Sequence, residues 1–149
     1  MDSCIFCKII KGEIPSFKIW ENKEFLAILD INPNTRGMTL LLSKKHYDSY
    51  LEEMPDDVYQ RFWLVAKKVS RLLDKKLKTK RTAMVLEGMG INHAHIKLYP
   101  LHGLEKKFQE MLGDRRVFYD NYPGFIDTRL GPKTSLEKLE KLAKKIKGN

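Results

Sequence analysis

The ten residues 91–100, Ile-Asn-His-Ala-His-Ile-Lys-Leu-Tyr-Pro, constrain the fold of this chain more than any other stretch. Polar side chains stand at positions 93, 95 and 97, and small or apolar ones stand at positions 94, 96 and 98. This period of two is typical of a half-buried strand, so we predict a strand over residues 91–99 with one side in a core. The other side presents two histidines and a lysine at intervals of about 7 Å. Such a row suits an anion, a metal ion or both.

The remaining patterns predict four more strands and three helices. Alternating or continuous apolar residues, bounded by turn residues, indicate strands over 17–20, 25–29, 38–42 and 82–86. Apolar residues spaced three and four apart predict a short helix over 4–11, a long helix that begins at Pro55, and an amphipathic helix after Thr134. We therefore predict an α+β fold: a five-stranded antiparallel sheet with one long helix packed on it, plus a C-terminal helical extension.

The chain has 149 residues, of which 42% are hydrophobic, and this is enough for one packed domain. We place one domain at 1–127 and the C-terminal amphipathic helix extension at 128–149. No apolar run reaches the length of a membrane span, and the first ten residues lack the features of a signal peptide. A cytoplasmic location without membrane association is therefore expected.

The formal net charge of +9 comes mainly from residues 67–81 and from the tail after Lys133. Both segments are predicted helices, so solvated lysine faces are favoured over a nucleic-acid-binding surface. Aromatic residues do not alternate with these lysines, as a base-stacking surface would require. A positive surface would still attract polyphosphate substrates.

Cys4 and Cys7 are the only cysteines, and their C-x-x-C spacing lets both thiols reach one metal ion from a short helix. His46, at the exit of the third strand, and His93, at the start of the fifth, would complete a tetrahedral site if those strands are neighbours. The sequence thus predicts a structural zinc site with these four ligands. His102 is a competing ligand, and two cysteines that serve only as small core residues are the alternative.

His95 lies between His93 and Lys97, and imidazole is a competent nucleophile toward phosphorus near neutral pH. The attack needs a fixed tautomer and donors or cations for the phosphate oxygens. Lys97 is suited to hold a phosphate oxygen or to stabilise a leaving group. We predict that both are catalytic residues.

Four blocks in this order resemble the histidine triad (HIT) superfamily, nearest its small nucleotide-binding branch. They are Cys-Ile-Phe-Cys-Lys-Ile-Ile-Lys-Gly-Glu-Ile-Pro at 4–15, Leu-Asp-Ile-Asn-Pro at 29–33, Ser-Lys-Lys-His at 43–46, and Ile-Asn-His-Ala-His-Ile-Lys at 91–97. Together the blocks span about residues 4–100, two thirds of the chain, and the last block is a variant H-x-H-x-K motif.

The resemblance implies an α+β homodimer that binds nucleoside monophosphate groups and hydrolyses or transfers them through a nucleotidyl-histidine. His95 matches the nucleophile, and Asp30 matches the residue that holds the ribose hydroxyls. The matching base pocket comprises Ile5, Phe6, Ile9, Ile28 and Ile31. Zinc-carrying members place their ligands at positions that match Cys4, Cys7, His46 and His93.

Two departures from the family pattern affect the chemistry. The third triad position is Lys97 rather than histidine, which leaves the reaction type open. The phosphate loop, Leu86-Glu87-Gly88-Met89-Gly90, is short and lacks the usual asparagine and glutamine. Lys97 and the backbone N–H groups around Gly88 and Gly90 are the predicted substitutes.

The resemblance, taken with these residues, implies a nucleotide hydrolase or nucleotidyltransferase that cleaves a nucleoside monophosphate, AMP above all, from a phosphoramidate or a dinucleoside polyphosphate. The alternative is a nucleotide-binding or regulatory module without turnover. The altered triad and the short loop motivate that alternative.

Overall fold

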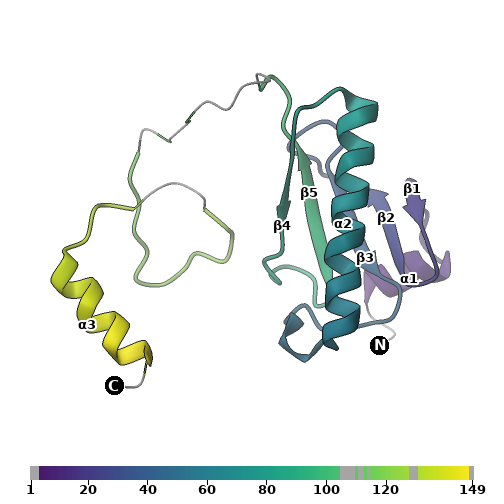
Figure 1. The fold of residues 1–149 in the computed structure, drawn as a ribbon. Coiled ribbons are helices and arrows are strands. Elements are labelled where there is room, and N and C mark those ends of the chain that lie inside the picture. The colour runs from purple at the N-terminus through teal and green to yellow at the C-terminus, as the bar shows by residue number, and fades with distance from the viewer. Residues whose placement is uncertain (1–3, 105–109, 111–112, 114, 128–130, 148–149) are drawn as a thin grey trace. The chain divides into compact units, whose positions relative to one another are not determined.

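The computed structural model describes residues 4–104, 110, 113, 115–127 and 131–147 (Figure 1). In chain order the elements are α1 (Ile5–Lys11), β1 (Lys18–Glu21), β2 (Phe25–Leu29), β3 (Thr39–Ser43), the 3₁₀ helix η1 (Leu51–Glu53), α2 (Asp56–Leu77), β4 (Thr82–Val85), β5 (His95–Pro100) and α3 (Leu136–Lys147). The strands form one antiparallel sheet in the order β1-β2-β3-β5-β4. The predicted α+β fold, with its five-stranded antiparallel sheet and long helix, is confirmed.

The strand predicted over 91–99 is shorter than its alternation suggested, because β5 begins only at His95. Before it, the His93 N–H donates to the carbonyl of Ile91 at 2.8 Å, and the Ala94 N–H donates to the carbonyl of Tyr47 at 2.8 Å. These bonds bend the chain away from the sheet ladder. His93 therefore lies in the approach to the strand rather than within it.

One face of the sheet is covered by α2, which runs along the strands (Figure 1). Ala94, Ile96 and Leu98 are fully buried beneath it, as the alternation predicted. The rings of Phe25 from β2 and Phe62 from α2 stack at 5.1 Å between centroids. Burying each large apolar side chain of this layer contributes about 1.5–3 kcal/mol, so this face carries much of the stability.

The opposite face is covered by α1 through one buried side chain, Phe6. Phe6 packs on a patch that β2 and β3 present together: Leu26, Ile28, Leu40 and Leu42. Gly12 ends the helix at φ 80°, a conformation that glycine adopts without steric cost. A helix of seven residues is too short to persist alone, so its contacts with the sheet hold it in place.

The chain divides into two compact units between residues 108 and 109. The second unit contains α3, which supplies the predicted C-terminal helix, while the predicted domain boundary at 127/128 stays a prediction. Within the described residues, no helix combines the length and the apolarity needed to cross a bilayer. The cytoplasmic location also stays a prediction.

Candidate metal centre and candidate active site

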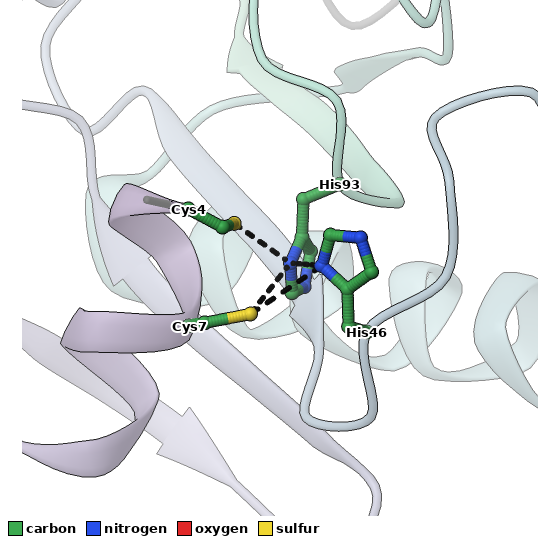
Figure 2. Close-up of side chains that lie close together, drawn as sticks. All are labelled: Cys4, Cys7, His46 and His93. Atoms are coloured by element: carbon green, nitrogen blue, oxygen red, sulfur yellow. Dashed lines mark hydrogen bonds between the residues drawn. The ribbon is translucent and has the colours of Figure 1, made fainter. Parts of the chain in front are cut away.

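The four predicted metal ligands meet at one point (Figure 2). Cys4 is the N-cap residue of α1 and Cys7 lies in the first turn of that helix, whereas His46 comes from the loop after β3 and His93 from the bend before β5. One ligand atom of each residue lies within 4.8 Å of the others. The neighbouring positions of β3 and β5, on which the prediction depended, are observed in the sheet.

The separations of the ligand atoms match a tetrahedral zinc site. Tetrahedral coordination at usual zinc bond lengths separates a sulfur and a nitrogen ligand by about 3.5 Å, and two nitrogens by about 3.3 Å. The Cys4 Sγ lies 3.4 Å from the His93 Nδ1, and the Cys7 Sγ lies 3.4 Å from the His46 Nδ1. The two Nδ1 atoms are 3.1 Å apart. The donor set of two sulfurs and two nitrogens is also one that zinc prefers.

The outer nitrogens of both histidines indicate which nitrogens face the metal. The Nε2 of His93 donates to the carbonyl of Ser43 at 2.8 Å, which leaves a lone pair on Nδ1. The Nε2 of His46 lies 3.5 Å from a carboxylate oxygen of Asp48, which favours the same tautomer. Two nitrogen lone pairs that face each other repel unless a cation lies between them. The arrangement therefore fits a bound metal ion.

Protonation at this cluster is set mainly by burial. Burial lowers the pKa of His93 below its ordinary value of 6.5, and the neighbouring His46 and His95 lower it further. Burial also raises the pKa of the Cys7 thiol, and the adjacent Cys4 adds to the effect. The metal-free cluster thus favours a neutral imidazole at His93 and a protonated thiol at Cys7. Metal binding would release the thiol proton.

The structure bears on both alternatives to this set of ligands. His102 lies outside the cluster, where its Nε2 donates to the carbonyl of Arg36 at 2.9 Å. Cys4 and Cys7 are only partly buried, and both thiols face imidazole nitrogens.

Three residues that sequence reasoning missed, Asp48, Ser49 and Asn92, connect the two segments that carry the histidine ligands. The side-chain oxygen of Asn92 accepts hydrogen bonds from the N–H and the hydroxyl of Ser49, at 2.9 and 3.1 Å. Its amide nitrogen donates to Asp48 at 3.2 Å, and the same Asp48 oxygen faces His46. Asn92 therefore links the segment that carries His93 to the segment that carries His46. The signal available in the sequence was a polar asparagine at position 92, where the alternation of the predicted strand favours an apolar residue that faces the core.

His95 has the fixed tautomer that a nucleophile needs. Its Nδ1 donates to the carbonyl of His93 at 2.7 Å, so Nε2 is the nitrogen with a lone pair. The ring is 5% exposed and packs edge-on against Phe6, with centroids 5.3 Å apart. This imidazole lines a cavity rather than the hydrophobic interior.

That cavity has a volume of about 410 Å³ and lies among α1, the end of β2, and the loop before β5. Most residues predicted to bind the nucleotide line it: Ile5, Phe6, Ile9, Ile28, Asp30, Ile31 and Gly90, with His95 and Lys97. Gly88 instead lines a second cavity, of about 450 Å³, on the other side of the same loop. Ile14, Pro15, Met89 and Ile91 also line the first cavity, and sequence reasoning did not assign them.

Asp30 lies at the exit of β2 and shapes the turn that follows. One of its carboxylate oxygens accepts the N–H of Asn32 at 2.8 Å. Burial raises the pKa of the Tyr99 hydroxyl above its ordinary value, and the negative charge of Asp30 raises it further.

Lys97 forms an ion pair that the sequence did not reveal. Its ammonium donates to a carboxylate oxygen of Glu87, which lies in the turn between β4 and β5. The Glu87 side chain is 9% exposed and the Lys97 side chain 23%. The third triad position therefore carries a half-buried, paired cation.

A family model described as HIT domain matches residues 11–103. An uncharacterized HIT-like protein of Methanocaldococcus jannaschii is 43% identical over 102 residues, which cover 65% of this chain and 78% of that protein. An adenosine 5′-monophosphoramidase of Candida albicans is 38% identical over 109 residues, which cover 66% and 70%. The chain belongs to the histidine triad (HIT) family.

Solved structures agree with this assignment. A Streptococcus mutans UA159 protein has a TM-score of 0.73 at 27% identity, over 99% of this chain and 85% of that one. A Zn-bound histidine triad family protein from Mycobacterium smegmatis has a TM-score of 0.62 at 28% identity, over 74% and 84%.

Proposed function

We propose that this protein is a nucleotide hydrolase that cleaves a nucleoside monophosphate, with AMP as the first choice, from a phosphoramidate. The reaction runs through a nucleotidyl group on the Nε2 of His95. One observation carries the proposal: a buried imidazole with Nδ1 committed to a backbone carbonyl presents its lone pair to a cavity of nucleotide size. The relative named as an adenosine 5′-monophosphoramidase supports this substrate class.

Different residues around the cavity contact different parts of the bound nucleotide in this proposal. The apolar patch Ile5, Phe6 and Ile9 packs the base, and Asp30 accepts hydrogen bonds from the ribose hydroxyls. The Nε2 of His95 then attacks the α-phosphorus, and the imidazole becomes cationic. The hydrogen bond from Nδ1 to the His93 carbonyl strengthens as that charge develops. Water later attacks the same phosphorus and releases the nucleotide.

We assign zinc to the cluster of Cys4, Cys7, His46 and His93 as a structural ion. Four protein ligands leave no open position for a catalytic water. The Zn-bound relative supports the choice of metal. Metal analysis of the purified protein should give one zinc per chain, and a protein free of zinc would refute the assignment.

We further propose a homodimer built on the domain 1–127, with 128–149 as an extension. Sedimentation equilibrium of the full chain should give twice the mass of one chain. A monomer at all concentrations would contradict this part of the proposal without touching the chemistry.

The decisive experiment uses His95→Asn, which keeps the size and polarity of the side chain but removes the nucleophilic nitrogen. We expect hydrolysis of adenosine 5′-phosphoramidate to fall by a factor on the order of 10³ or more, with the melting temperature and the zinc content retained. His102→Asn, at an exposed histidine, is the matched control.

A second measurement separates turnover from binding alone. Wild-type protein quenched during turnover should carry a nucleotidyl group on His95 by mass spectrometry. Nucleotide binding without this adduct, or near-normal activity in His95→Asn, would favour the non-catalytic module instead.

A further inference from the structure

The short helix α1 contributes to both sites of this protein. Its N-cap residue Cys4 and Cys7 of its first turn face the metal cluster, whereas its apolar side chains line the cavity proposed for the nucleotide. The ring of Phe6 packs edge-on against the rings of His93 and His95, with centroids 5.7 and 5.3 Å apart. A movement of α1 would therefore change the metal cluster, one wall of the cavity and the packing of the nucleophile together.

Few contacts hold α1 in this position. Phe6 is its buried side chain. Among the described residues, the side-chain hydrogen bonds that join α1 to the loops of the sheet come from Cys4 and Cys7, whose sulfurs lie 3.4–3.6 Å from imidazole nitrogens of the cluster. A helix of seven residues is not stable alone in water. The metal cluster is therefore the main polar attachment of this helix.

Cys4 and Cys7 also have the spacing of a pair that can form a disulfide. The Cys4 carbonyl accepts the N–H of Lys8 at 3.2 Å, so both cysteines belong to one helical turn. Residues three apart in such a turn have Cα atoms about 5 Å apart, within the range of roughly 4.4–6.8 Å that disulfides span. Both cysteines are only partly buried, so a small oxidant can reach them. They are the only cysteines of the chain, so a disulfide within one chain must join these two.

A disulfide at this pair and a bound metal ion exclude each other. Two thiolates of a tetrahedral zinc site are about 3.8 Å apart, whereas the sulfurs of a disulfide are about 2.05 Å apart and carry no negative charge. The oxidised chain would keep only His46 and His93 as ligands. Two neutral imidazoles hold zinc far more weakly than the full set of four ligands, so oxidation releases the metal.

We propose that Cys4 and Cys7 are a redox modification site, at which a peroxide closes a disulfide, releases the metal ion and thereby weakens nucleotide binding through α1. The last step rests on the proposed function, because it needs a nucleotide in the cavity. The closure of the disulfide and the release of the metal do not depend on that function.

The oxidation balances with hydrogen peroxide as the electron acceptor. In the metal-bound form both sulfurs are thiolates, the reactive form of cysteine. One thiolate forms a bond to a peroxide oxygen, the O–O bond breaks, and hydroxide leaves. The second thiolate attacks the resulting sulfenic sulfur, the S–O bond breaks, and a second hydroxide leaves. Two electrons pass from the sulfurs to the peroxide, and a thiol reductant returns two electrons to the disulfide.

Loss of the metal also disturbs the bend before β5. The Nδ1 atoms of His46 and His93 are 3.1 Å apart, and their lone pairs repel once no cation lies between them. The two rings would therefore move apart. The carbonyl of His93 accepts the hydrogen bond from Nδ1 of His95, so this movement reaches the nucleophile. The oxidised protein should bind a nucleotide weakly and turn it over slowly.

The test uses the full chain loaded with zinc and oxidised with diamide, a reagent that couples thiols without attacking thioethers. Diamide is needed because Met89 lines the cavity and peroxide also oxidises methionine. The mass of the chain should fall by about 2 Da, the mass of two hydrogen atoms, and a metal-binding dye should detect the released zinc. The Kd for AMP, measured by calorimetry, should rise about 5–150-fold. A thiol reductant with added zinc should reverse all three changes.

A chelator separates the loss of the metal from the disulfide. Reduced protein stripped of zinc should bind AMP as weakly as the oxidised protein does, with no change in mass. Because a coupling free energy is reciprocal, saturating AMP should raise the zinc affinity of the reduced protein by the same factor. Equal AMP affinities of the loaded and the stripped protein would overturn the coupling through α1.

Cys7→Ser removes one sulfur of the pair. This variant should bind AMP weakly from the start, and diamide should change neither the mass of its monomer nor its AMP affinity. His102→Ala, at a histidine outside the cluster, is the control and should respond to diamide as the wild type does. A fall in AMP affinity on oxidation of Cys7→Ser would place the effect at other residues and overturn the proposal.

The remaining outcomes separate the parts of the proposal. An unchanged mass or retained zinc after diamide treatment would overturn the redox site. Released zinc with an unchanged AMP affinity would overturn its control of the cavity. Reduced, zinc-loaded protein that binds no AMP would overturn the proposed function and the last step with it, while the mass and the zinc release would still decide the redox site.

Discussion

The carbonyl oxygen of His93 lies 2.7 Å from the Nδ1 of His95 and accepts a hydrogen bond from it. The side chain of the same His93 faces Cys4, Cys7 and His46 in the metal cluster. One residue therefore sets the tautomer of the nucleophile through its backbone and contributes to the metal site through its ring. A change in the bend that carries His93 should affect both sites.

Replacing His46 by alanine should lower the zinc content and the stability together. A metal held at a free concentration 100 times its Kd contributes about 2.7 kcal/mol. At roughly 2–4 °C per kcal/mol for a chain of this size, the melting temperature should fall by about 5–10 °C. Metal analysis and calorimetry measure the two effects. His102→Ala is the control, because His102 lies outside the cluster, and equal losses in both variants would contradict the site.

Replacing Asn92 by alanine should weaken zinc binding without removing a ligand. The variant loses the bonds that tie Asp48 and Ser49 to the bend before β5. Loss of such supporting contacts typically costs about 10–100-fold in metal affinity, which competition with a chelating dye would measure.

Asn22→Ala is the matched control for that experiment. The Asn22 side chain also accepts hydrogen bonds from backbone N–H groups, those of Glu24 and Phe25, but in the turn between β1 and β2. The Asn22→Ala substitution should lower the free energy of unfolding and leave the zinc affinity unchanged. Similar zinc affinity in the two variants would show that the Asn92 bonds do not support the ligands.

Replacing Gly88 by alanine should destabilise the protein more than replacing Gly12. Both glycines have positive φ, 69° and 80°, and alanine in that region costs about 1–2 kcal/mol. At Gly88 an added Cβ would also lie 3.0 Å from the carbonyl oxygen of Ser49, whereas nothing lies within 4 Å at Gly12. Urea denaturation gives the two free energies. Equal losses of unfolding free energy in the two variants would mean that the turn at Gly88 moves away from Ser49 at no energetic cost.

Replacing Asp30 by asparagine should lower the pKa of the Tyr99 hydroxyl. Burial and the Asp30 charge hold that pKa above its ordinary value of 10.0, so the folded state binds the phenolic proton more tightly than the unfolded state. The contribution of Tyr99 to stability is therefore complete below about pH 10 and is lost as the pH rises above that value. The difference in absorbance at 295 nm between each protein and its Tyr99→Phe partner isolates this titration. An unchanged midpoint would place Asp30 too far from the ring to matter.

The fold was predictable because its strands and its long helix carry strong periodic patterns. The strand over 25–29 was predicted at its observed bounds, and the long helix was predicted to begin at Pro55, one residue before its first helical residue. The apolar side of the strand predicted over 91–99 was also correct, since Ala94, Ile96 and Leu98 are completely buried. The metal cluster followed from ligand chemistry, on the condition that the third and fifth strands are neighbours, and the sheet meets that condition.

The contacts that the sequence did not reveal depend on the backbone conformations of turns and loops. The bend at 91–93 follows from hydrogen bonds to Ile91 and Tyr47, which local alternation does not encode. The contact between Glu87 and Lys97 depends on backbone conformations at Gly88 and Gly90 that bring residues ten apart together. The support from Asn92 requires the loop after β3 to fold back beside β5.

The alternation of side chains along β5 limits how this site can change over evolutionary time. A shift of β5 by one residue would exchange the two faces of the strand. The His95 imidazole would then face the apolar layer beneath α2, and Ile96 would face the cavity. The turn at 86–91 lies outside the sheet ladder and is free of this restriction. Differences in length among homologues should therefore accumulate in that turn, while the strand itself diversifies only by replacing one side chain with another.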